Sequence, residues 1–113
     1  MAQFGIICPP YPGHLNPFSA LGRELPSRGH QVIFLQIPDL ELKVRSEGLN
    51  FYPIGESTYQ PGTMKETFLQ FAKFSELEAL QYSVKFCLEM AEMICRDAPK
   101  AIAKIGIETL LVD

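Results

Sequence analysis

The sequence is poor in several residue types: among 113 residues it has no tryptophan, three cysteines and two histidines. Basic residues are also few, since ten Lys and Arg face thirteen Asp and Glu and leave a net charge of -3. Nucleic-acid binding needs a basic surface, so this charge argues against DNA or RNA as a partner. No apolar run approaches the roughly 20 residues that span a bilayer, and a strand pattern begins directly after Met1. We therefore expect no transmembrane segment and no signal peptide.

The cysteines are odd in number and lack the Cys-x-x-Cys spacing of zinc and redox motifs. This pattern indicates reduced thiols in a cytoplasmic protein, and we predict no metal site. Cys8 lies in the first apolar run, whereas Cys87 and Cys95 fall in a helical segment, where we expect both to be buried.

Phosphate-binding motifs are absent as well. The segment after the first apolar run is Pro9-Pro10-Tyr11-Pro12, which is rigid and has few free backbone N–H groups. It cannot replace the GxGxxG turn that binds the pyrophosphate of a dinucleotide, and no GxxxxGK[ST] sequence occurs anywhere. Asp39, which follows the second strand, is therefore interpreted as a helix N-cap and not as a ribose-binding acid. We predict no cofactor for this chain.

Strand-like and helix-like segments alternate along the sequence. Short apolar or β-branched runs predict strands at 4–8, 31–37, 49–54 and within 107–113. Helical periodicity and capping residues predict helices after Asn16 and at 39–47, 64–74, 77–96 and 97–105. Strands separated by helices pair in parallel, so the predicted fold class is α/β, a Rossmann-like doubly wound sheet. For its strand order we take the common arrangement 3-2-1-4.

His14 lies in the segment Pro12-Gly13-His14-Leu15-Asn16-Pro17, which joins the first strand to the first helix. Asn16 has N-cap chemistry and Pro17 suits the first helical position, so we expect His14 in the loop before the helix. The positive end of the helix dipole disfavours protonation of a nearby imidazole, and a neutral imidazole can accept a proton. A general base is one role for His14, and a polar or capping residue is the other.

Asp113 follows the last strand, and the predicted strand order makes this strand a neighbour of the first one. Adjacent strands lie about 4.8 Å apart, so we expect His14 and Asp113 to come within hydrogen-bond reach. A carboxylate beside an imidazole fixes its tautomer and stabilises the imidazolium, whereas the alternative role for Asp113 is capping. His30 precedes the second strand at the opposite edge of the sheet, and we predict a structural role for it.

Two predicted helices carry apolar faces. The longest helix has one stripe at three-four spacing, formed by Leu77, Leu80, Val84, Cys87, Ala91 and Ile94. We interpret this stripe as core packing against the sheet. The helix at 64–74 carries Phe68 and Phe71 and follows a long polar loop, which leaves both core packing and ligand contact open.

The turn around His14 is followed by Leu21-Gly22-Arg23-Glu24-Leu25 and by Arg28-Gly29-His30-Gln31-Val32-Ile33-Phe34. In this combination the chain resembles the opening of family 1 glycosyltransferases of the GT-B fold. That family comprises UDP-sugar-dependent enzymes, among them bacterial macrolide and zeaxanthin glucosyltransferases. The similarity covers 1–40 and resumes at 109–113, while the middle is compatible in pattern alone. Pro26 departs from the pattern, because it falls within the expected first helix.

The resemblance implies an inverting transfer of a sugar, with glucose favoured, from a UDP-sugar to a hydroxyl of a small lipophilic acceptor. His14 would match the family's general base, and Asp113 would match the acid that holds and balances it. The residues implied for acceptor binding are Tyr11, Gly13, Tyr59, Met64 and Phe68.

The family holds its donor nucleotide mainly in a second, C-terminal Rossmann-like domain, and the motif of that domain is absent from 1–113. We therefore expect a partial, acceptor-binding domain over 1–113 that needs a complementary donor-binding domain and transfers no sugar alone. The alternative is a non-catalytic binding or assembly module, or half of a split glycosyltransferase completed by a partner chain. An exposed apolar edge at the last strand would favour a homo-oligomer or such a partner. A third interpretation is a small flavodoxin-like domain, whose phosphate loop this sequence lacks.

Overall fold

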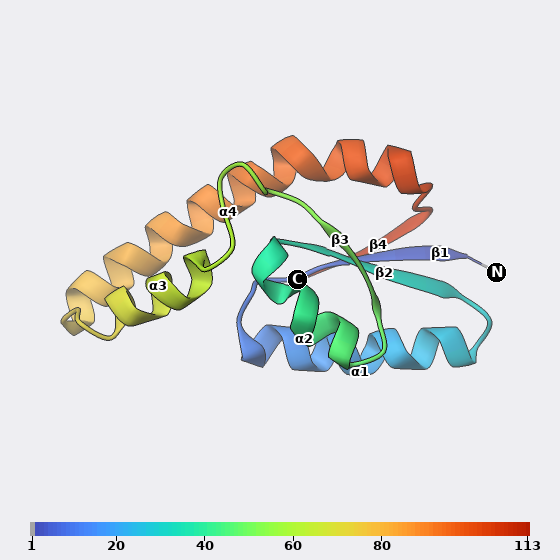
Figure 1. Cartoon of the computed structure of the whole chain (residues 1–113), viewed down its shortest axis with the longest axis horizontal. Helices are drawn as coiled ribbons and strands as arrows, with labels where there is room; N and C mark the ends of the chain where they lie inside the picture. Colours follow the sequence, from blue (N-terminus) through green and yellow to red (C-terminus); the bar gives the residue numbers. More distant parts are fainter. Residues whose placement is uncertain (1) are drawn as a thin grey trace.

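A four-stranded parallel sheet of order β3-β2-β1-β4 forms the centre of the molecule (Figure 1). The structure is a computed structural model that describes residues 2–113. Its strands are β1 (Gln3–Ile7), β2 (Gln31–Gln36), β3 (Asn50–Pro53) and β4 (Thr109–Val112). The predicted fold class and strand order are thereby confirmed.

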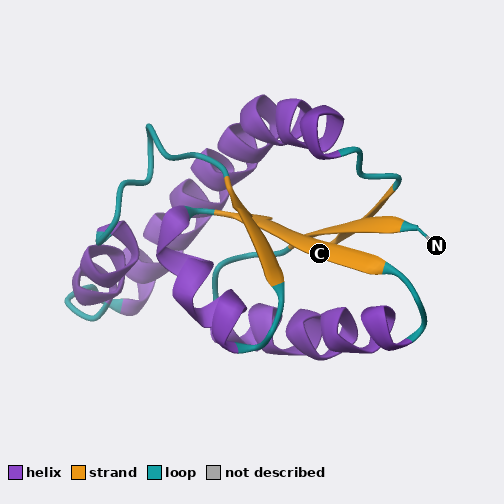
Figure 2. Ribbon diagram, turned by 45° about the vertical axis from the view of Figure 1, so that its right-hand side comes forward, coloured by secondary structure: helices purple, strands orange, loops and turns teal. Residues whose placement is uncertain are grey.

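Helices cover both faces of this sheet (Figure 2). They are α1 (Pro12–Ser27), α2 (Glu41–Ser46) after the 3-10 turn η1 (Pro38–Leu40), α3 (Thr63–Phe71) and α4 (Glu76–Ile105). Helices α1 and α2 lie on one face and the C-terminal half of α4 lies on the other (Figure 1). The N-terminal half of α4 extends beyond the sheet together with α3 (Figure 1). Within 2–113, no helix combines the length and apolarity that crossing a membrane requires.

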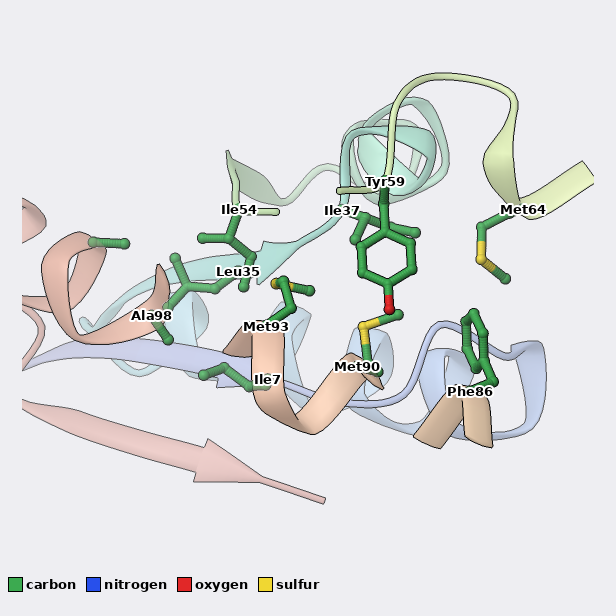
Figure 3. Packing of buried hydrophobic residues seen from close by; sticks show 11 residues of the cluster. Ile7, Leu35, Ile37, Ile54, Tyr59, Met64, Phe86, Met90, Met93 and Ala98 are labelled. Atoms are coloured by element: carbon green, nitrogen blue, oxygen red, sulfur yellow. The ribbon is translucent and has the colours of Figure 1, made fainter. Parts of the chain in front are cut away.

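The core has two layers, because successive side chains of a strand point to opposite faces. Ile6 and Phe34 belong to the layer between the sheet and α1 and α2. Ile7 and Leu35, one residue further along each strand, belong to the layer beneath α4. This second layer also contains Ile37, Ile54, Tyr59, Met64, Phe86, Met90, Met93, Ala98 and Ala101 (Figure 3).

Helix α1 begins earlier than predicted. Tyr11 is its N-cap, Pro12 occupies the first turn, and the Leu15 amide donates to the Tyr11 carbonyl at 2.8 Å. The prediction of Asn16 as N-cap is therefore wrong, and His14 lies in the first turn of the helix instead of in a loop. Both Pro12 and Pro17 suit a first helical position, and the buried contact of Leu15 with the sheet favours the earlier start.

Helix α4 is continuous, whereas two helices were predicted in this region. It begins with a capping box between Ser75 and Glu78, runs through Pro99 and ends at Gly106, whose φ of 81° is left-handed. The predicted core stripe is exposed over most of its length, from Leu77 at 65% to Ala91, and Ile94 alone of its residues is half-buried, so the prediction of core packing is wrong for most of it. The N-terminal half of α4 extends beyond the sheet, so no strand covers it. The helical periodicity of the sequence predicted an apolar face on α4 but could not predict what this face contacts. Cys87 and Cys95 are also exposed, which corrects the prediction that both are buried.

Candidate functional site

The candidate site lies at the carboxyl ends of β1 and β4, which are neighbours in the sheet. Their register pairs Ile7 with Val112, and the Asp113 amide then donates to the Ile7 carbonyl at 3.1 Å. The ladder therefore extends to Asp113 and holds its backbone beside the start of the β1–α1 connection. Ligands of open α/β sheets bind at such a point, where the order of the strands reverses.

His14 and Asp113 are hydrogen-bonded through Nδ1 of the imidazole and Oδ2 of the carboxylate. Both side chains remain accessible, with 48% of His14 and 39% of Asp113 exposed. An ionised carboxylate only accepts hydrogen bonds, so in the tautomer that pairs with it Nδ1 carries the proton and Nε2 is left as an acceptor. The strand order predicted this contact, and the structure forms it.

A pocket of about 260 Å³ includes Asp113 in its lining, whereas its partner His14 is not among the lining residues. Its walls are residues 7–11 from β1 and the following connection, together with Val112 and Asp113. Helix α4 closes the other side with Phe86, Cys87, Met90, Ala91, Ile94 and Cys95. The lining is mostly apolar, and the Asp113 carboxylate lies at its edge. This composition suits a lipophilic molecule that presents one polar group to the hydrogen-bonded pair.

All three cysteines line this pocket. Burial, reinforced by the negative charge of Asp113, raises the pKa of the Cys8 thiol to about 12. Cys8 is therefore a neutral thiol at ordinary pH and forms part of the apolar wall. Among residues 2–113, no group of three or more His, Cys, Asp or Glu side chains is arranged to hold a metal ion.

The five residues implied for acceptor binding separate into three groups. Tyr11 lines the pocket, and Phe68, which is 45% exposed, packs on Tyr11 with ring centroids 6.1 Å apart. Tyr59 and Met64 do not line it, because both are buried in the core layer beneath α4. Gly13 lies on the exposed side of the first turn of α1, with no atom within 4 Å of where a Cβ would be.

The α4 wall of the pocket was missed as a binding surface. Its signal was present in the sequence, because Cys87, Ala91 and Ile94 recur at helical spacing, but this stripe was assigned to the core. Phe86 and Met90 lie one position away on the helix and reach both the pocket and the core. An apolar stripe that borders a cavity and one that borders a core have the same periodicity.

Two distant carboxylates hold the loop and helix that flank the site. Asp39 accepts hydrogen bonds from the backbone amides of Gly62 and Met64, each at 2.8 Å, and so caps α3. The prediction that Asp39 caps the helix immediately after it is therefore wrong. Asp97 accepts from the Gly55 amide at 3.0 Å, and the hydrogen bond from Arg96 lowers the pKa of Asp97. The loop between β3 and α3 is thus fixed at both ends.

A family model described as the glycosyltransferase family 28 N-terminal domain matches residues 12–109. The chain belongs to this family. A zeaxanthin glucosyltransferase of Pantoea ananas is 27% identical to this glycosyltransferase domain over 113 residues. A second zeaxanthin glucosyltransferase, from Pseudescherichia vulneris, is 25% identical over 114 residues. Both alignments cover 100% of this chain and 26% of the relative, so the domain spans about a quarter of the length of these relatives.

A solved structure of the glycotransferase of kitacinnamycin also aligns with the glycosyltransferase domain. The TM-score is 0.45 at 20% sequence identity, over 98% of this chain and 30% of that chain. The family match and the curated relatives confirm the prediction of the N-terminal part of a GT-B glycosyltransferase. The family model is that of family 28, whereas the motifs around His14 and His30 resemble family 1.

Proposed function

We propose that this domain binds the acceptor of an inverting glycosyltransferase and supplies its general base, His14. The acceptor is a small lipophilic molecule, and one of its hydroxyls receives a sugar, glucose by analogy with the named relatives, from a UDP-sugar. The observation that carries the proposal is the His14–Asp113 hydrogen bond at the edge of an apolar pocket. A base without a pocket, or a pocket without a base, would not serve this reaction.

In the proposed mechanism the acceptor hydroxyl gives its proton to Nε2 of His14. Its oxygen then forms a bond to the anomeric carbon of the sugar, while the bond from that carbon to the UDP oxygen breaks. Asp113 holds Nδ1 and stabilises the imidazolium that forms. Attack on the face opposite the leaving UDP inverts the anomeric configuration.

The donor requires groups outside this domain. Within 2–113 the connection after β1 is rich in proline and offers no glycine-rich turn for a diphosphate. We propose that a complementary C-terminal domain holds the UDP-sugar, as the family resemblance implies, and that 1–113 alone is inactive. The unpaired cysteines support location in the cytoplasm, where thiols stay reduced.

The test compares two proteins. One is 1–113 alone, and the other is a chimera in which 1–113 replaces the matching quarter of the Pantoea ananas zeaxanthin glucosyltransferase. We expect UDP-glucose-dependent glucosylation of hydroxylated apolar acceptors by the chimera and none by 1–113. The control is the Pantoea ananas enzyme from which the matching quarter has been deleted and not replaced. A folded chimera that glucosylates no such acceptor would contradict the proposal, and transfer by 1–113 would contradict the need for a donor domain.

A second candidate function is assembly with a partner chain, as one half of a split transferase. The observation that favours it is the edge strand β4, where Leu110 and Val112 are exposed apolar residues. An unpaired apolar strand edge is a ready site for another chain. Light scattering during size-exclusion chromatography tests this candidate, which predicts a mass above that of one 12.7 kDa chain.

A further inference from the structure

The hydroxyl of Tyr59 is buried without a hydrogen-bond partner. The residue is only 5% exposed, and among residues 2–113 its oxygen has no hydrogen-bond partner. Buried polar groups in folded proteins are nearly always paired, because burial removes their hydrogen bonds to water. The exceptions deserve a functional explanation.

The unpaired hydroxyl is directed toward side chains that also line the pocket beside Asp113. Figure 3 shows the Tyr59 oxygen pointing toward Met90, and the Phe86 ring lies to the right of both side chains. The Tyr59 and Phe86 rings meet edge to face, with their centroids 6.1 Å apart. Phe86 and Met90 belong to the same core layer as Tyr59 and also line the pocket. These two side chains therefore form the partition between the hydroxyl and the pocket.

Met90 is the side of this partition that can move. Methionine has three rotatable side-chain bonds and no branch, so it adapts to a new neighbour at low cost. Rotation of Met90 would connect the hydroxyl with the pocket without moving the backbone of α4. Because burial raises the pKa of Tyr59, the phenol remains protonated and is available as a donor.

We propose that the Tyr59 hydroxyl recognises the ligand: it donates a hydrogen bond to an oxygen of an apolar molecule that enters between Phe86 and Met90. The ligand class is an apolar ring system that carries a carbonyl or hydroxyl oxygen at the end opposite the reacting hydroxyl. This inference rests on the proposed function, since it assumes that the pocket binds the acceptor. It adds a specificity determinant, because the rest of the pocket lining is mostly apolar and Asp113 is engaged with His14.

The experiment uses 1–113 and two probes of nearly equal shape, 2-acetylnaphthalene and 2-isopropenylnaphthalene. The first probe, a ketone, carries a carbonyl oxygen where the second, an alkene, carries a methylene group. Dissociation constants are measured by equilibrium dialysis for the wild type, Tyr59→Phe and Tyr52→Phe. Tyr52 is the matched control, because it is half-buried on β3 and does not line this pocket. Thermal unfolding of the three proteins is recorded in parallel.

The wild type should bind the ketone about five- to tenfold more tightly than the alkene, as one neutral hydrogen bond provides. Tyr59→Phe should remove this preference and leave the affinity for the alkene unchanged, while Tyr52→Phe should change neither. Tyr59→Phe should also keep or raise the melting temperature, since it deletes an unpaired buried group. The methyl carbon resonance of Met90 should shift when the wild type binds the ketone.

Four results would overturn the inference. One is a ketone preference that survives Tyr59→Phe, and another is a fall in melting temperature, which would reveal a partner for the hydroxyl in the free protein. The third is failure of both probes to bind, which would also remove the pocket from the proposed function. Binding of both probes with no preference removes the role of Tyr59 alone and leaves the proposed function in place.

Discussion

His14 and Asp113 lie 99 positions apart in the sequence and are joined by a hydrogen bond between Nδ1 and Oδ2. The contact exists because β1 and β4 are neighbours, so the connection after one strand meets the end of the other. The pairing gives the imidazole a defined orientation beside Asp113, which lines an apolar pocket.

The first prediction concerns the tautomer of His14. The carboxylate of Asp113 requires a proton on Nδ1, so the neutral imidazole should be the Nδ1–H form. In Asp113→Asn the amide can donate to the ring, and the proton should move largely to Nε2. Two-bond nitrogen–hydrogen correlation spectra distinguish the two forms. The resonances of His30, at the other end of the sheet, should not change, and an unchanged His14 spectrum would contradict the pairing.

Thiol reactivity should separate Cys8 from the other two cysteines. Cys8 is buried, and its pKa of about 12 leaves almost no thiolate at neutral pH. Cys87 and Cys95 are exposed on α4 and should react. Peptide mapping after brief treatment with N-ethylmaleimide should locate adducts on these two residues in the native protein. Cys8 should react only after unfolding in denaturant, and its rapid modification in the native state would show that the pocket wall is open.

The pH dependence of stability should contain a contribution from Asp97. The hydrogen bond from Arg96 lowers the pKa of Asp97 in the folded state below its unfolded value of about 4. The carboxylate therefore stabilises the fold above that value, and the contribution is lost as the pH falls through the lowered pKa. In Asp97→Asn, which keeps an acceptor for the Gly55 amide, the unfolding free energy near neutral pH should fall by about 0.5–1 kcal/mol.

Urea denaturation of the wild type and Asp97→Asn at a series of pH values measures this contribution. The difference between the two proteins should be largest above about pH 5 and should vanish near about pH 2, when the carboxylate is protonated. Added salt should reduce it, because Arg96 and Asp97 are partly exposed. A difference independent of pH would assign the effect to packing instead of charge.

The features predicted correctly from the sequence are those set by strand periodicity and parallel topology. Buried strands separated by helices predicted a parallel sheet, and the common 3-2-1-4 order, assumed for it, placed His14 near Asp113. The start of α1 was missed, because Pro12 and Pro17 both suit a first helical position and tertiary packing of Leu15 decides between them. The residues around the start of α1 do not by themselves predict that packing.

The rest of the site depends on contacts between distant segments. The stripe on α4 indicated an apolar face, but only the structure shows that one part of it lines a pocket and another part extends beyond the sheet. Asp39 has the chemistry of an N-cap, and the helix that it caps starts 24 positions later, at Thr63. The unpaired hydroxyl of Tyr59 has no signature in the sequence, since pairing is a property of the folded surroundings.

The turnover number of the glucosyltransferase chimera with His14→Ala tests the central claim most directly. Loss of a general base should lower kcat by about 10²- to 10⁴-fold with little change in acceptor binding. His30→Ala is the matched control and should retain turnover, because His30 accepts a hydrogen bond from the Ala2 amide at the opposite end of the sheet. A His14→Ala chimera that folds, binds acceptor and keeps a kcat close to that of the unsubstituted chimera would contradict the assignment of His14 as the base.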